Sequence, residues 1–249
     1  MGSFVNALVW RLHQKRNWIT DRSVCTHCGH QLAVRDLVPV FSWLVLKGRC
    51  RYCSKKIEDN PLVEIFTALL FVFSYIYWPQ DLGSTQVILF SFWLVFLVGF
   101  MALAAYDLKW LLLPNSIIYT LLVLAATQIT WLAIADPGVN LLKESLLGLL
   151  VGGGIFYLLF QISKGKWIGG GDVKLGALLG LLVGGPLGSF LMLFLASLLG
   201  SAASMPLLIT KRATRGTRLP FGPFLILAAI IVRLFGAAII DWYKNQLLL

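Results

Sequence analysis

Long stretches without a charged residue constrain this chain more than any other feature. Four such runs occur, at residues 82–106, 110–135, 145–163 and 175–210. Each is long enough for the roughly 17–25 residues that a helix needs to cross a bilayer core. Of all residues, 58% are hydrophobic and only 13% are charged, about half the charge of an average soluble domain. We therefore expect an all-α polytopic membrane protein, and we exclude a disordered chain and an ordinary soluble enzyme.

The pattern predicts about seven to eight transmembrane or half-membrane helices. The run 175–210 is too long for one helix, and Gly184-Gly185-Pro186 is the natural break within it. The helices are expected at residues 1–12, 61–78, 86–106, 115–135, 143–163, 173–183, 187–209 and 223–240. The first is too short to span, so it is a half-span, an interfacial helix or a truncated first span. Three regions follow: this short helix (1–12), a polar four-cysteine loop (13–60) and a multi-spanning domain (61–249).

The basic residues predict the orientation. The chain carries 21 Lys and Arg against 11 Asp and Glu, and cytoplasmic loops of membrane proteins collect Lys and Arg. With the 13–60 loop inside, segments 107–114, 164–174 and 211–220 are also inside, and that side holds most of the positive charge. Orientation and attraction to anionic lipid account for this excess. We expect the lipid bilayer and no nucleic acid as a partner.

Two aspartates lie where an inside segment meets a hydrophobic run. Asp107 follows the run 82–106, and Asp172 ends Gly169-Gly170-Gly171-Asp172 at the start of a short helix. Ionisable groups at membrane depth are costly and are functional candidates by default. Three consecutive glycines let another backbone, such as a substrate peptide, approach closely. The alternatives are interfacial acids paired with Lys109 or Lys174, and a glycine loop used only for packing.

Two carboxylates brought together in a low-dielectric site cannot both ionise, so they share a proton. One then acts as a base on water while the protonated partner polarises a peptide carbonyl. This chemistry needs neither a metal nor a nucleophilic side chain, and it requires that Asp107 and Asp172 meet in space.

The four cysteines form two pairs, Cys25-x2-Cys28 and Cys50-x2-Cys53. Four thiolates in two such knuckles match a tetrahedral zinc site, although the spacer is one residue longer than usual. Disulfides are the alternative, and a reducing cytoplasm disfavours them. Because four cysteine ligands close the coordination sphere, we expect structural zinc that takes no part in catalysis.

The segment Pro220-Phe221-Gly222 opens the last predicted span. It serves either as a turn into that helix or as part of the site at the same membrane face.

The ordered set of motifs resembles the prepilin peptidase (type IV leader peptidase) family over nearly the whole chain. The resemblance rests on residues 2–6 with Arg11, the two cysteine knuckles, residues 39–43 and 60–64, Asp107 with 113–115, residues 169–174 and residues 220–224.

The resemblance implies a GxGD aspartic endopeptidase of the bacterial inner membrane. Such an enzyme removes the basic leader of type IV prepilins or pseudopilins on the cytoplasmic side. Asp107 and Asp172 match the two catalytic aspartates. Many members also N-methylate the new N-terminus with S-adenosylmethionine, and the resemblance alone leaves this second activity open.

Two rival interpretations remain. Presenilin-like enzymes share a Tyr-Asp and a Gly-x-Gly-Asp, but they end in a Pro-Ala-Leu motif that this sequence lacks. The other rival interpretation is a non-catalytic zinc-loop membrane scaffold or transporter component. It predicts that Asp107→Asn leaves function intact.

Overall fold

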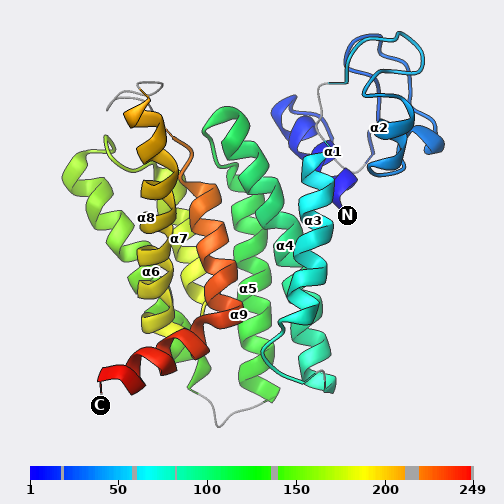
Figure 1. Ribbon diagram of the computed structural model, residues 1–249. Helices are drawn as coiled ribbons and strands as arrows, with labels where there is room; N and C mark the ends of the chain where they lie inside the picture. The colour runs from blue at the N-terminus through cyan, green and yellow to red at the C-terminus, as the bar shows by residue number, and fades with distance from the viewer. Residues whose placement is uncertain (18–19, 58–60, 82, 136–139, 211–218, 248–249) are drawn as a thin grey trace. The chain divides into compact units, whose positions relative to one another are not determined.

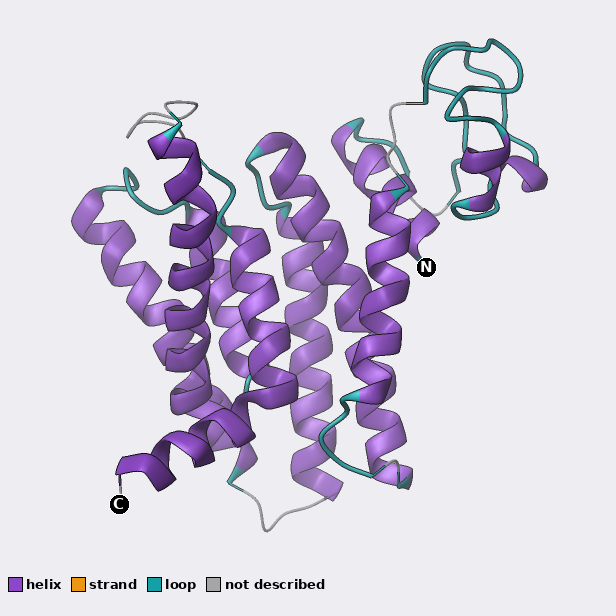
Figure 2. Cartoon of the chain, viewed as in Figure 1, coloured by secondary structure: helices purple, strands orange, loops and turns teal. Residues whose placement is uncertain are grey.

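The computed structural model describes residues 1–17, 20–57, 61–81, 83–135, 140–210 and 219–247. Within these residues the chain is built of helices and loops, without an extended strand (Figure 2). The elements in chain order are α1 (Gly2–His13), η1 (Val34–Asp36), α2 (Phe41–Val45), α3 (Leu62–Ile76), α4 (Ser84–Trp110), α5 (Asn115–Ala135), α6 (Leu141–Ser163), α7 (Gly170–Leu182), α8 (Gly185–Ile209) and α9 (Gly222–Leu247).

Five of these helices are long and apolar enough to cross a membrane: α4, α5, α6, α8 and α9. The shorter apolar helix α3 has 15 residues, and α7 has 13. The all-α polytopic fold expected from the sequence is therefore confirmed, as is the break between α7 and α8, where Gly184 and Gly185 both have positive φ.

One predicted helix end is wrong in a place that matters. The sequence places Asp107 in a loop after residue 106, whereas α4 continues to Trp110. No helix-breaking residue occurs before Pro114, and the Tyr106 and Trp110 rings, four residues apart on one helix face, pack with centroids 4.5 Å apart. Asp107 consequently belongs to the last turn of a rigid helix.

Contacts divide the chain into two compact units. Unit 1 comprises Met1–Ile76 and Trp93–Ala105, and unit 2 comprises Tyr77–Phe92 and Tyr106–Leu249. In unit 1, α1 packs against α3, and the approach is so close that a side chain on Gly2 would collide with the backbone of Glu64. The indole N–H of Trp93 donates to the buried Ser74 hydroxyl at 3.1 Å.

The centre of unit 2 is the close antiparallel pair α6 and α7 (Figure 1). A Cβ built on Gly152 would lie 2.6 Å from the carbonyl oxygen of Gly176, and one built on Gly176 would lie equally close to that of Gly152. Ser189 of α8 donates to the carbonyl of Gly148 at 2.9 Å, which attaches a third helix to this pair. Small residues thus permit a backbone contact that larger ones would prevent.

Some sequence features lie outside the described residues. These are the basic cluster in 211–218, the Asp136-Pro137-Gly138 turn and Asn60.

Candidate functional site

Asp107 is the more buried of the two candidate aspartates, with 5% of its surface exposed. Its Oδ2 accepts a hydrogen bond from the backbone N–H of Gly222 at 3.0 Å. Gly222 is the first residue of α9, so this N–H is one of the helix-terminal donors that have no partner inside the helix. The positive end of the α9 dipole also favours a carboxylate at this position.

Asp172 lies in the first turn of α7 and caps the N-terminus of that helix. Its Oδ2 accepts a hydrogen bond from the N–H of Gly169 at 3.3 Å, and its own N–H donates to the Gly169 carbonyl at 3.1 Å. Gly169 is the N-cap, whereas Gly170 and Gly171 belong to the helix. Asp172 thus caps the N-terminus of its own helix, whereas Asp107, in the last turn of α4, binds the N-terminus of α9.

Leu113 connects the surroundings of the two acids. A Cβ built on Gly171, the neighbour of Asp172, would lie 3.0 Å from the Leu113 Cβ. A Cβ built on Gly222 would lie 3.5 Å from the Leu113 Cδ2 and 2.7 Å from Oδ2 of Asp107. The two acids are close enough for the negative charge of Asp107 to act on Asp172. Residues 65 positions apart in the chain thus lie in the same part of unit 2.

A lysine on the next part of α7 has a partner that the sequence did not indicate. Lys174 Nζ donates to Oδ1 of Asn115 at 2.8 Å and lies 5.5 Å from the centroid of the Tyr119 ring. This contact ties α7 to the start of α5, and so holds the loop that contains Leu113 against the site. Sequence spacing carries no signal for such a pair, because 59 residues separate its members.

The segment Pro220-Phe221-Gly222 lies at the same site. The Phe221 ring packs edge-on against Phe156 of α6, with centroids 5.8 Å apart, and the Phe221 carbonyl accepts the N–H groups of Phe224 and Leu225. These contacts fix the direction of the Gly222 N–H toward Asp107. Of the predicted loop residues, Gly222 thus has a direct partner at the site, and Gly169 binds the second acid.

The site can support acid–base chemistry. It combines two carboxyl groups with the helix N-termini that bind them. Two carboxyl groups that share one proton can act as base and acid on the same substrate.

The four cysteines of unit 1 form a second candidate site. Their Sγ atoms all lie within 4.8 Å of one another, and those of Cys25 and Cys53 are 3.8 Å apart. Zn–S bonds of about 2.3 Å in a tetrahedron require sulfur atoms about 3.8 Å apart, whereas a disulfide requires about 2.05 Å. The cysteines are free, so the cluster fits a metal ion.

The two knuckles have the same backbone turn. The N–H of Gly29 donates to the Cys25 carbonyl and that of Ser54 to the Cys50 carbonyl, both at 2.9 Å. Gly29 and Ser54 both adopt positive φ, at 70° and 57°. Burial raises the pKa of Cys25, but hydrogen bonds from the backbone of Cys28 and His27 lower it to about 6. A lowered thiol pKa favours the thiolate, which is the form that binds a metal ion.

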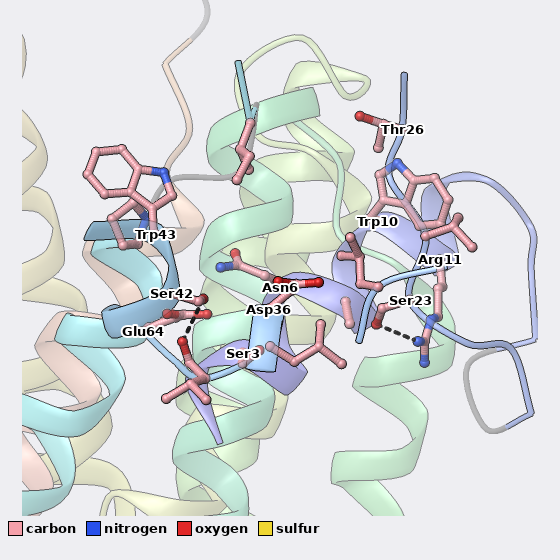
Figure 3. A pocket seen from close by; sticks show the side chains of 17 residues that line it. Ser3, Asn6, Trp10, Arg11, Ser23, Thr26, Asp36, Ser42, Trp43 and Glu64 are labelled. Carbon is pink, nitrogen blue, oxygen red and sulfur yellow. Dashed lines mark hydrogen bonds between the residues drawn. The ribbon is translucent and has the colours of Figure 1, made fainter. Parts of the chain in front are cut away.

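Unit 1 also contains a cavity of about 160 Å³ between α1, α3 and the cysteine loop. Figure 3 shows Asn6, Asp36, Ser42 and Glu64 in the middle of this pocket. Trp10 and Trp43 lie at opposite edges of the same view. Asn6 and Glu64 belong to the motif segments 2–6 and 60–64, and nothing in their spacing predicts a shared pocket.

Both acids of the pocket are held by hydrogen bonds. Glu64 Oε2 accepts the N–H of Val40 at 2.6 Å, and this contact stabilises a valine with φ of 59°, which is costly for a β-branched residue. Asp36 accepts from Arg51 at 2.7 Å and from Tyr52 at 3.1 Å. Burial raises the pKa of Asp36, but the hydrogen bonds from Arg51, Tyr52 and Ala33 together lower it below its ordinary value.

One polar group of the pocket lacks a partner. The indole Nε1 of Trp43 is buried and makes no hydrogen bond within the described part of the chain. A buried donor without an acceptor costs about 1–3 kcal/mol. The pocket is therefore lined by aromatic rings and by the carboxylates of Asp36 and Glu64, of which Asp36 is already paired with Arg51.

Comparison with known proteins identifies similar sequences over the whole chain. A model described as the bacterial peptidase A24 N-terminal domain matches residues 1–78. A model described as the type IV leader peptidase family matches residues 94–205. No solved structure gives a significant match.

Several curated proteins are similar at nearly full length. The leader peptide-processing enzyme for type 4 prepilin-like proteins of Escherichia coli O78:H11 is 35% identical, over 92% of this chain and 88% of that protein. The prepilin leader peptidase/N-methyltransferase of Stutzerimonas stutzeri is 30% identical, over 98% and 90%. The protein of the same name from Bacillus subtilis is 29% identical, over 100% and 95%.

Proposed function

The chain belongs to the type IV leader peptidase family, and we propose that its paired aspartates hydrolyse the leader peptide of type IV prepilins or pseudopilins. The observation that carries this proposal is the meeting of Asp107 and Asp172 at one site of unit 2, with the Gly222 N–H bound to Asp107. The relatives are named for processing prepilin leader peptides.

In the proposed reaction, one carboxylate takes a proton from water as the water oxygen attacks the scissile carbonyl carbon. The other aspartate, protonated, donates a hydrogen bond to the carbonyl oxygen. Collapse of the tetrahedral intermediate breaks the C–N bond, and the leaving amine takes a proton from an aspartic acid. The products are the leader with a new carboxylate and the mature chain with a new amino group. Neither a metal nor a covalent intermediate is needed.

The test is cleavage of a purified prepilin by the full-length protein in detergent or vesicles. We expect Asp107→Ala and Asp172→Ala each to abolish cleavage while the protein still inserts into membranes. The exposed Asp241→Asn is the matched control and retains cleavage. Wild-type cleavage by either alanine variant overturns the catalytic assignment of that residue and favours the scaffold or transporter interpretation.

We propose that the site faces the cytoplasm of a bacterial inner membrane. Lys109 follows Asp107 in α4, while Lys164 and Lys166 precede the glycines that lead to Asp172. These lysines belong to the same membrane face as the site, and a concentration of positive charge is typical of the cytoplasmic side.

We further propose that Cys25, Cys28, Cys50 and Cys53 bind a structural zinc ion. The sulfur separations and the matched turns support a four-thiolate site. All four ligands come from the protein, so the ion would stabilise the loop and leave hydrolysis to the aspartates.

A second activity, N-methylation of the new N-terminus, is supported by the names of the relatives and by the pocket of unit 1. S-adenosylmethionine carries a sulfonium and an amino group. Both are cations that suit the carboxylate of Glu64 and the faces of Trp10 and Trp43. When bound, this cofactor would supply the methyl group.

Calorimetric titration of the full-length protein with S-adenosylmethionine tests this assignment apart from any activity. We expect binding by the wild type and by Asp241→Asn, and at least a tenfold loss of affinity in Glu64→Gln. Equal affinity in the wild type and Glu64→Gln would place the cofactor elsewhere.

A further inference from the structure

The polar loop that carries the four cysteines exposes an apolar surface. Its large side chains belong to η1, to α2 and to the turn between them, and they are Val34, Val38, Phe41, Leu44 and Val45. Each of the five has at least 43% of its surface exposed, and η1 and α2 are neighbours in space. We call these residues the α2 patch. Exposed apolar clusters of this kind mark surfaces that bind a membrane or another protein.

Helix α2 has two different faces. Phe41, Leu44 and Val45 share one face, because they are spaced by three and four positions. The other face carries Ser42 and Trp43, which line the pocket of unit 1 (Figure 3). The contacts that hold α2 in the loop are thus made by its pocket face, and its apolar face is left for a surface outside the loop.

A hydrogen bond places α2 at the membrane surface. Val40, the residue before α2, donates its N–H to Oε2 of Glu64 at 2.6 Å. Glu64 lies in the first turn of the apolar helix α3. Because the polar cysteine loop ends just before α3, this first turn lies where the chain enters the bilayer. The α2 patch is therefore held at the same depth as the boundary between lipid headgroups and acyl chains.

The charge next to the patch suits anionic lipid. The exposed basic residues of the segment 34–49 are Arg35, Lys47 and Arg49. Asp36 is the only acid between positions 34 and 49, and its carboxylate is paired with Arg51 at 2.7 Å. The segment consequently carries uncompensated positive charge. Anionic headgroups attract basic residues beside a membrane, and apolar side chains next to such residues are buried at the acyl boundary.

We propose that the α2 patch inserts into an anionic leaflet of the membrane and that its basic neighbours bind lipid phosphates. Helix α3 supports lipid as the occupant, because its Phe66 and Leu69 are also exposed and continue the apolar surface from the turn of Glu64 into the bilayer. The insertion holds the cysteine loop against the membrane. The inference concerns this loop alone and does not depend on hydrolysis by the two aspartates.

Fluorescence quenching by lipid tests the insertion. The full-length protein is reconstituted as one chain per lipid nanodisc, so that a second copy cannot cover the patch. An apolar fluorescent amino acid replaces Phe41 in the patch, Phe66 on α3 as a membrane reference, or Gln31, which is exposed, polar and outside the patch. Lipids with brominated acyl chains quench from within the bilayer, whereas iodide quenches from water.

We expect brominated lipid to quench the label at position 41 at least fivefold more than the label at position 31. Iodide should quench position 31 more strongly than position 41. The label at position 66 should be quenched by lipid in every sample, which shows that the protein is inserted. Equal quenching of positions 41 and 31 by brominated lipid overturns the proposal and makes a protein the occupant of the patch.

A charge reversal tests the part of the basic residues. In nanodiscs with anionic lipid, Arg49→Glu is expected to lower the lipid quenching of the label at position 41 at least threefold. Lys244→Glu is the matched control, because it makes the same change of charge at an exposed position of α9 and should leave the quenching unchanged. Equal quenching in Arg49→Glu and Lys244→Glu would refute the binding of lipid phosphates.

Discussion

The backbone N–H of Gly222 donates a hydrogen bond to Oδ2 of Asp107 at 3.0 Å, across 115 residues of chain. One donor at the start of α9 thus supports a buried carboxylate at the end of α4. The bond also fixes where the Phe221 segment lies relative to the acid. It explains why a glycine occupies position 222: a Cβ there would lie 2.7 Å from the same oxygen.

Gly222→Ala is expected to displace the Asp107 carboxylate and lower kcat for leader cleavage about 100-fold, the cost of a misplacement of about 1 Å. Substrate binding is expected to change little. Steady-state kinetics separate the two effects. Gly154→Ala is the matched control, because a Cβ on Gly154 has open space around it. A wild-type kcat for Gly222→Ala would show that the position of this carboxylate is not critical.

The α6–α7 contact gives a prediction about stability. Gly152→Ala forces a methyl group against the Gly176 carbonyl at 2.6 Å, and such overpacking costs about 1–3 kcal/mol. Thermal unfolding in detergent should therefore show a lower Tm for Gly152→Ala, whereas Gly154→Ala on the same helix should show no loss. Equal Tm values for the two variants would mean that these helices are not in backbone contact in the folded protein.

The sequence predicted the fold well because a bilayer imposes length and composition on each span. Helix α5 was predicted at the residues where it is found, since Pro114 and the charge at Asp136 bound it. The end of α4 was misplaced because a charged residue was taken as the end of a helix, although Asp107 accepts a hydrogen bond from another helix and can remain in α4.

The candidate site, like the fold, was predictable from the sequence in part. Asp107, Asp172 and the cysteines are recognisable from residue type and local spacing. The role of Leu113 depends on its contacts with Gly171 and Gly222, and those of Lys174 and Asn115 on a contact between α7 and α5. The pocket around Trp43 depends on the packing of α1, α3 and the loop. Residue spacing along one chain does not encode these contacts, so only the structure reveals them.

Removal of the cysteine ligands gives a third prediction. The double change Cys25→Ser and Cys28→Ser should eliminate bound zinc and lower the Tm, because the binding free energy of a structural metal contributes to folding. Metal content is measured by mass spectrometry on the purified protein. His27→Ala, which changes a residue between the two cysteines, should retain one zinc per chain. A wild-type protein without zinc would reject the metal assignment.

The lowered pKa of Asp36 predicts a dependence on pH. Burial opposes ionisation, but Arg51, Tyr52 and the Ala33 N–H bind the ionised form more strongly. A carboxyl group whose pKa is lower in the folded state stabilises that state above its unfolded pKa, about 3.9, and the stabilisation is lost as the pH falls through the folded pKa. Asp36→Asn should therefore lower the Tm at pH 7 and have a smaller effect near pH 3. An equal effect at both pH values would show that the charge of Asp36 is not the cause.

The central claim is that Asp107 and Asp172 act as one catalytic pair, and the cleavage rates of Asp107→Asn, Asp172→Asn and the double variant test it most directly. Residues that act as a unit are strongly non-additive. We predict that each single variant loses about four orders of magnitude in kcat and that the double variant is no slower than either. A single variant that cuts a prepilin at the wild-type rate, or losses that simply multiply in the double variant, would contradict the account.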